Sequence, residues 1–98
     1  MTREDIISVL RAARAEIERE GAVALYMYGS RARGDARPDS DVDLFVDYDA
    51  GKKFSLLDLA GIKLIADQAL ALDAHVTTRD SLHPKLKSDI ERQAVRIF

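Results

Sequence analysis

The stretch from residue 23 to residue 48 constrains the fold of this chain more than any other part of the sequence. Two segments, 23–28 and 42–48, are apolar and rich in β-branched and aromatic residues, which predicts two buried strands. Between them, Gly29-Ser30 predicts a tight turn, and Arg31-Ala32-Arg33 predicts a short helical turn with free N–H groups at its start. The chain therefore leaves one strand, passes through a turn and a polar loop with a break at Pro38, and re-enters the sheet.

The second strand begins with two aspartates, Asp41 and Asp43. Residues i and i+2 of a strand project to the same face, so the two carboxylates should lie side by side above the sheet. Two anions held this close repel each other, and a divalent cation commonly relieves the repulsion. The alternative is a pair of solvated residues at a loop end. Together with backbone N–H groups at Gly29-Ser30 that can meet phosphate oxygens, the pair predicts a nucleotide site.

The spacing of these residues resembles a known signature. Gly29-Ser30, ten intervening residues and Asp41-Val42-Asp43 resemble the DNA polymerase β-type nucleotidyltransferase superfamily. The longer pattern, Gly-Ser-Arg-Ala-Arg-Gly followed by Ser-Asp-Val-Asp-Leu, resembles the minimal nucleotidyltransferase (MNT) proteins, which are often paired with a HEPN-domain partner. The resemblance implies an α/β (α+β) nucleotidyltransferase fold, with a small mixed β-sheet and helices packed mainly on one face.

The resemblance also implies roles for the motif residues. Asp41 and Asp43 would be the catalytic residues and would hold Mg²⁺, with Mn²⁺ as a second candidate, while ATP is the substrate. Gly29 and Ser30 would hold its β- and γ-phosphates.

Three further residues belong to the expected nucleotide-binding set. Arg31 and Arg33 lie two residues apart and cannot share a helix face, so one is expected to reach phosphate while the other pairs with a nearby aspartate. The sequence does not say which. Ser40 either orients Asp41 by a hydrogen bond or caps the turn.

The third acidic metal ligand of the superfamily has no obvious counterpart in this chain. Counting back from Leu82-His83-Pro84, which matches the MNT pattern, the acidic position falls on His75. Asp73 is two residues earlier and would share a strand face with His75. Asp73 could supply the ligand through a shifted register, His75 could supply it, or the ligand could be missing. Imidazole is a poor ligand for Mg²⁺ and a better one for Mn²⁺ or Zn²⁺.

Two functions follow from the resemblance. In the first, the chain is an antitoxin enzyme that transfers AMP from ATP to a hydroxyl, expected to be a tyrosine, of a HEPN-domain toxin. In the second, catalysis has lapsed with the third carboxylate, and the chain neutralises its partner by binding alone.

Composition limits the other functions. With 98 residues and 47% hydrophobic content, the chain is expected to form a single domain, 1–98. The net charge of -2 argues against a long nucleic acid as partner, because the affinity of a protein for nucleic acid comes mostly from neutralising phosphates with basic side chains. Cysteine is absent, which excludes thiolate metal sites. No apolar run is long enough for a membrane span, so a cytoplasmic protein is expected, as a homo- or hetero-oligomer or alone.

The remaining elements follow from apolar periodicity and capping patterns. Helices are predicted over 2–20 and 55–70, each opened by a Ser/Thr-x-x-Asp capping pattern, and a third near 84–93. A third strand is predicted over 72–78 and a short edge strand at 95–98. Within the first strand, alternation predicts that Val23, Leu25 and Met27 share one face.

Overall fold

The computed structural model describes residues 1–98 and contains one four-stranded sheet with the strand order β3-β2-β1-β4. β1 (Ala22–Tyr28) pairs antiparallel with β2 (Val42–Tyr48) and with the short β4 (Val95–Arg96). β3 (Ala74–Thr78) pairs parallel with β2. The sheet is therefore mixed, which confirms the predicted fold class.

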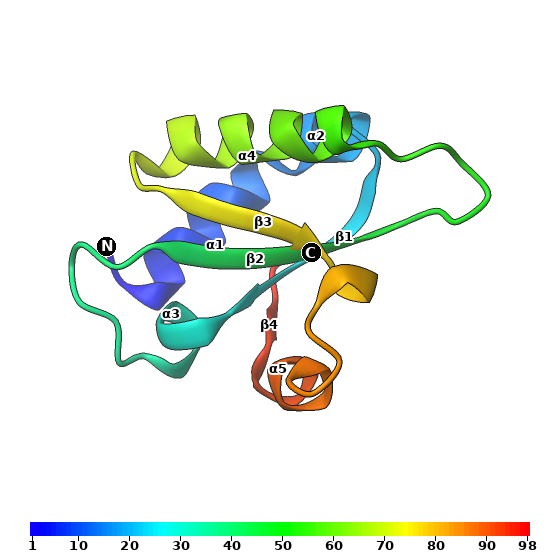
Figure 1. Ribbon diagram of the computed structural model, residues 1–98. Helices are drawn as coiled ribbons and strands as arrows, with labels where there is room; N and C mark the ends of the chain where they lie inside the picture. The colour runs from blue at the N-terminus through cyan, green and yellow to red at the C-terminus, as the bar shows by residue number, and fades with distance from the viewer.

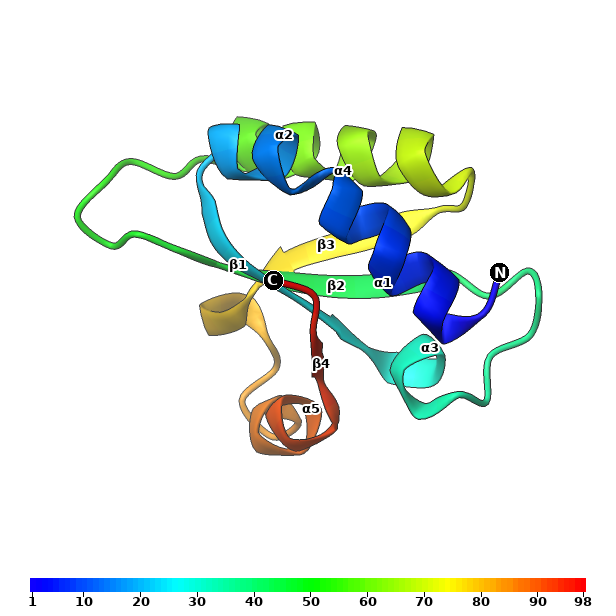
Figure 2. The same cartoon turned by 180° about the vertical axis from the view of Figure 1, so that it is seen from behind.

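Three helices lie on one face of the sheet, as Figures 1 and 2 show from opposite sides: α1 (Arg3–Ala12), α2 (Arg14–Arg19) and α4 (Leu56–Leu70). The short α3 (Gly29–Arg33) follows β1 directly, and η1 (Arg79–Ser81) and α5 (Lys87–Gln93) lie toward the opposite face. None of the helices combines the length and the apolar character needed to cross a membrane.

Both predicted capping patterns start a helix. The Thr2 hydroxyl accepts a hydrogen bond from the Asp5 backbone N–H, and the Asp5 carboxylate accepts one from the Thr2 N–H. Ser55 and Asp58 form the same reciprocal pair at the start of α4. Each pair satisfies N–H groups that a helix otherwise leaves without partners.

The predicted single helix over 2–20 is wrong in one respect, because the chain bends at Ala13 and forms two helices. Ala13 has φ -90° and ψ 6°, outside the helical region, and it separates α1 from α2. The bend lets both segments follow the twisted sheet, so that Ile6 and Leu10 of α1 and Ile17 of α2 are all fully buried.

The faces of β1 also differ from the simple alternation. The register of β1 against β2 shifts between Ala22 and Ala24, which marks a bulge. A bulge adds one residue to one strand and reverses the alternation on one side of it. Val23 is consequently 53% exposed, whereas Leu25 and Met27 face the core as predicted. The third strand is shorter than predicted and begins at Ala74.

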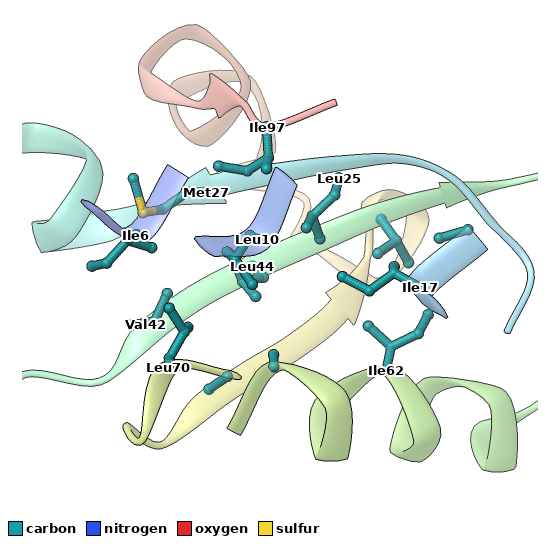
Figure 3. Packing of buried hydrophobic residues seen from close by; sticks show 14 of the residues in the cluster. Ile6, Leu10, Ile17, Leu25, Met27, Val42, Leu44, Ile62, Leu70 and Ile97 are labelled. Atoms are coloured by element: carbon teal, nitrogen blue, oxygen red, sulfur yellow. The ribbon is translucent and has the colours of Figure 1, made fainter. Parts of the chain in front are cut away.

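The main hydrophobic core lies between the sheet and helices α1, α2 and α4. Figure 3 shows the side chains of this core, which come from both helical and strand segments; its fully buried members include Ile6, Leu10, Ile17, Leu25, Met27, Val42, Leu44 and Ile62. Their burial removes apolar surface from water at roughly 25 cal/mol per Å², which is the main stabilisation of the sheet against its helices.

A second, smaller cluster covers the opposite face of the sheet. The rings of Tyr26 and Phe45 stack with centroids 4.8 Å apart, and the Arg79 guanidinium lies over both, 4.8 and 4.9 Å from their centroids. Arg79 donates to both carboxylate oxygens of Asp47, at 2.8 and 3.0 Å, and to Glu91 of α5 at 2.6 Å. These ion pairs raise the pKa of Arg79 and tie η1 and α5 to the sheet.

Candidate active site

Four polar side chains meet where β2 and β3 begin. Asp43 and His75 are directly paired across the parallel β2–β3 ladder. Asp41 and Asp73 each stand two residues before one of them, and the Val42 N–H donates to the Asp73 carbonyl at 3.0 Å. Because the strands are parallel, the two pairs start at the same edge of the sheet, and the i, i+2 relation places each pair on one face. We call Asp41, Asp43, Asp73 and His75 the strand-end cluster.

His75 makes the short contacts that hold the strand-end cluster together. Its Nε2 atom lies 3.1 Å from Asp41 Oδ2 and 3.5 Å from Asp73 Oδ2. One ligand atom from each of these three residues can be chosen so that all lie within 4.8 Å of one another, and all three side chains are exposed. The structure therefore brings both candidates for the third ligand, Asp73 and His75, beside Asp41.

Asp43 lies deeper than its neighbours. Burial raises the pKa of its carboxyl group, and the nearby charge of Asp41 raises it further, while His75 and Arg33 act in the opposite direction. Burial has this effect because a low-dielectric surrounding disfavours the charged form. A cation bound beside Asp43 would reverse the effect by stabilising the carboxylate.

The Gly29 turn is built around the Asp43 carboxylate. Gly29 has φ +73°, a conformation that side chains with a Cβ atom rarely adopt, and a Cβ atom at this position would lie 2.5 Å from Asp43 Oδ2. Tyr28, the residue before it, is directly paired with Asp43 across the antiparallel ladder. Ser30 follows in the first turn of α3. Gly29 of the bend and the partly buried Asp43 carboxylate thus occupy adjoining space.

Arg31 takes neither of the two roles, phosphate contact or pairing with an aspartate, that the sequence left open between Arg31 and Arg33. Its side chain is 5% exposed, and its guanidinium donates to the Ser40 carbonyl at 2.8 Å and to the Pro38 carbonyl at 3.1 Å. These bonds fasten the loop that leads to Asp41. Arg31 is a structural residue of the site, because its donors already satisfy backbone carbonyls that the loop would otherwise leave unpaired.

Ser40 and Arg33 have different surroundings from Arg31. The Ser40 hydroxyl accepts a hydrogen bond from the Arg37 N–H at 2.9 Å, so its side chain caps the loop turn, the second of the two predicted roles. Arg33 pairs with Asp35 at 3.2 Å, and both side chains are largely exposed. Arg33 is therefore the arginine that pairs with an aspartate, and because an exposed pair of this kind contributes little to stability, it is also the more accessible of the two arginines.

Lys63 is a site residue that sequence reasoning missed. Its Nζ atom lies 2.7 Å from Asp73 Oδ1, 3.0 Å from Asp67 Oδ2 and 2.7 Å from the Ala74 carbonyl. The hydrogen bond and charge of Lys63 hold the pKa of Asp73 below its ordinary value. The i, i+4 spacing of Lys63 and Asp67 on α4 was a sequence signal, but nothing local in the sequence pointed to Asp73.

The strand-end cluster suits a divalent cation by the chemistry of its donors. The carboxylates of Asp41 and Asp73 and the His75 imidazole converge at one edge, and Asp43 lies outside this trio, paired with His75 across the ladder. A hollow of about 420 Å³ borders the edge, lined by Lys63, Asp73, Ala74, His75 and Val76. Carboxylate oxygens are the preferred protein ligands of Mg²⁺ and Mn²⁺, and imidazole extends the set toward transition metals. Gly29 leaves space beside the partly buried Asp43 carboxylate that any side chain at position 29 would fill.

Comparison with known proteins adds independent information. The nucleotidyltransferase domain family matches residues 9–97 of this chain. A protein of Thermococcus cleftensis named protein adenylyltransferase MntA is 32% identical over 98 residues, covering 99% of this chain and 97% of the relative.

Two solved structures share the fold. A structure described as a minimal nucleotidyltransferase has a TM-score of 0.82 and 35% identity, covering 97% of this chain and 95% of that chain. A chain in a crystal structure of a toxin–antitoxin with AMP-PNP has a TM-score of 0.70 and 16% identity, covering 90% of this chain and 72% of that one.

Proposed function

This chain belongs to the nucleotidyltransferase domain family, and from that premise and the geometry of the strand-end cluster we propose that it transfers AMP from ATP to a hydroxyl group of a partner protein. The observation that carries the proposal is the contact between Gly29 and Asp43, which sets a carboxylate directly against the small-residue bend. The name of the Thermococcus cleftensis relative, a protein adenylyltransferase, supports AMP as the transferred group and a protein as the acceptor.

Asp41 and Asp43 are the residues proposed to hold Mg²⁺ or Mn²⁺. When bound, the cation neutralises the triphosphate and lowers the pKa of the attacking hydroxyl. Asp43 is fixed within β2 and backed by Gly29, so its carboxylate has a defined position. Asp41 lies just before the strand, and its loop is fastened through the bonds of Arg31 to Pro38 and Ser40.

The residues of the bend are proposed to bind the triphosphate. Backbone N–H groups at Gly29 and Ser30, together with the Ser30 hydroxyl, face the β- and γ-phosphates, and Arg33 adds a positive charge at the rim. In the reaction, the acceptor oxygen forms a bond to the α-phosphorus and loses its proton. The bond from the α-phosphorus to the bridging oxygen of the β-phosphate breaks, and pyrophosphate leaves. The chain orients the triphosphate for in-line displacement.

The proposed partner is a HEPN-domain toxin, and the proposed acceptor is one of its tyrosines. The support comes from two observations: the relative named MntA and the shared fold with a chain of a toxin–antitoxin structure. In this proposal the chain is the antitoxin, because an AMP group on a tyrosine adds a charged, bulky substituent that blocks the hydroxyl. The open edge of the strand-end cluster suits a macromolecular acceptor, since its side chains are exposed.

The test is transfer of label from α-labelled ATP to a co-purified HEPN-domain protein, with mass spectrometry to locate the AMP. The wild-type chain should label a tyrosine, and Asp43→Asn should abolish the label. Asp89→Asn is the matched control, because Asp89 is an exposed residue of α5 that pairs only with Arg92. Absence of label with the wild-type chain in Mg²⁺ and in Mn²⁺ would exclude the proposal.

A second candidate function is neutralisation by binding alone. It is favoured by one observation: the position paired with Asp43 on β3 holds His75 in place of a carboxylate. In a growth assay against the toxin, an Asp41→Asn/Asp43→Asn double variant should still protect cells if binding suffices. Loss of protection by a double variant that still forms the complex would rule out this second function.

A further inference from the structure

We infer that His75 is the nitrogen ligand of the metal site and that it shifts the preference of the site away from Mg²⁺ and toward Mn²⁺. The inference rests on the proposed function only for the location of the metal, at Asp41 and Asp43. It concerns a residue in which this chain departs from an all-carboxylate site. If the inference holds, the identity of residue 75 on β3 decides which cation this protein prefers.

The position of His75 is that of a ligand. It is paired with Asp43 across the β2–β3 ladder, so the two side chains project from neighbouring points on the same face. Its Nε2 atom is 3.1 Å from Asp41 Oδ2. In an octahedral site with ligand distances of about 2.1 Å, neighbouring ligand atoms are about 3 Å apart. The separation of the Nε2 and Oδ2 atoms is that of a hydrogen bond, and it also matches two adjacent ligands, so a cation can replace the shared proton without moving either side chain far.

Asp73, the competing candidate, is already engaged by Lys63. One carboxylate oxygen, Oδ1, accepts from Lys63 Nζ at 2.7 Å, and the same Nζ is held by Asp67 and by the Ala74 carbonyl. Asp73 therefore has one oxygen engaged by Lys63, and its Oδ2 lies 3.5 Å from His75 Nε2, farther than Asp41 Oδ2 at 3.1 Å. The shifted-register account, in which Asp73 replaces the missing carboxylate, is the weaker one.

The chemistry of imidazole then sets the preference. Mg²⁺ is a hard cation that is bound through oxygen and keeps several waters, whereas Mn²⁺ and the later first-row cations accept imidazole nitrogen readily. Replacing one carboxylate by an imidazole also removes one negative charge from the site, which weakens the binding of Mg²⁺ more than that of a cation that gains a nitrogen bond. The ratio of the two affinities should therefore depend on His75.

Electron paramagnetic resonance with MnCl₂ tests the inference on the full chain without measuring catalysis. Bound Mn²⁺ should show the coupling to a directly coordinated ¹⁴N nucleus in pulsed spectra. His75→Asn should remove this coupling. His83→Asn, the matched control, should keep it, because His83 is the other histidine of the chain and its Nδ1 accepts only from the Lys85 N–H near α5.

Competition by MgCl₂ gives the preference itself. In His75→Asp, which restores a carboxylate, the Mg²⁺ concentration needed to release half of the Mn²⁺ should fall about tenfold relative to wild type. An unchanged competition curve in His75→Asp, no nitrogen coupling in the wild type, or no Mn²⁺ binding at all would overturn the inference. If the nitrogen coupling is present but no AMP is transferred, the proposed function fails and the inference about His75 stands. If AMP is transferred but the coupling is absent, the proposed function stands and the inference about His75 fails.

Discussion

Gly29 and Asp43 occupy adjoining space in this protein: a Cβ atom at residue 29 would lie 2.5 Å from Asp43 Oδ2. The glycine of the bend therefore has two functions at once. It accepts a φ of +73°, and it leaves room for the carboxylate that the proposed reaction uses. The two halves of the sequence motif, which are separated by a loop in the chain, meet in this one contact.

The first prediction concerns this contact. Gly29→Ala should lower the free energy of unfolding by more than Gly34→Ala and should abolish AMP transfer. Both glycines have positive φ, so both substitutions carry a backbone cost of about 1–2 kcal/mol. Only at residue 29 would the new Cβ atom also clash with the Asp43 carboxylate, since nothing lies within 4 Å of a Cβ atom at Gly34. Urea unfolding and the labelling assay measure the two effects; equal losses in both variants would contradict the steric explanation.

The second prediction follows from the raised pKa of Asp43. In the unfolded chain the Asp43 carboxyl group has its ordinary pKa of 3.8 and is charged above that pH. In the folded chain the same group keeps its proton to a higher pH. The folded state binds more protons in that interval, so stability falls as the pH rises through the folded pKa. Asp43→Asn removes this loss.

The measurement is the unfolding midpoint in urea across a pH series. The Asp43→Asn variant should gain stability relative to wild type as the pH rises from 4 toward 7, and the difference should stop changing with pH below 3.8. The difference between the two proteins reports Asp43 together with its electrostatic coupling to Asp41 and His75, because the carboxyl groups that do not interact with Asp43 titrate in the same way in both. A constant difference at all pH values would show that burial of Asp43 has no electrostatic cost.

The third prediction separates the two arginines of the motif. Arg31→Met should destabilise the fold by about 1–3 kcal/mol, because the partly buried, charge-assisted hydrogen bonds to the carbonyls of Pro38 and Ser40 are lost. Arg31→Lys should recover only part of this, since one ammonium group cannot replace a planar fork that reaches both carbonyls. Arg33→Met should leave stability nearly unchanged and raise the KM for ATP. Urea unfolding and ATP titrations would show the opposite pattern if Arg31 were the phosphate contact.

The fourth prediction concerns the end of α4. Ala71 has φ +54° and ψ 34°, the left-handed conformation at a helix end that glycine adopts without strain. Ala71→Gly should therefore stabilise the protein, by up to about 1 kcal/mol after the greater freedom of glycine in the unfolded chain is subtracted. Ala69→Gly, two residues earlier inside the helix, should destabilise it by about 1 kcal/mol. Thermal unfolding of both variants measures the two signs.

Several features of this protein were determined by the sequence alone. Apolar alternation and turn residues fixed the two strands on either side of the Gly29-Ser30 bend, and the i, i+2 spacing fixed Asp41 and Asp43 at the start of the second strand. The capping patterns fixed where α1 and α4 begin. These features are local, because a residue's neighbours within one element decide its backbone conformation and the direction of its side chain.

Other features were decided only by the tertiary structure. The bulge that exposes Val23 depends on how β1 pairs with β2, and the burial of Arg31 depends on where the loop of Pro38 and Ser40 returns. The β2–β3 register places His75 beside Asp43, and Lys63 reaches Asp73 from another element. Such contacts join residues that are distant in the chain. Their geometry depends on strand register and on which buried polar groups require a hydrogen-bond partner. The apolar periodicity of a single segment predicts neither of these.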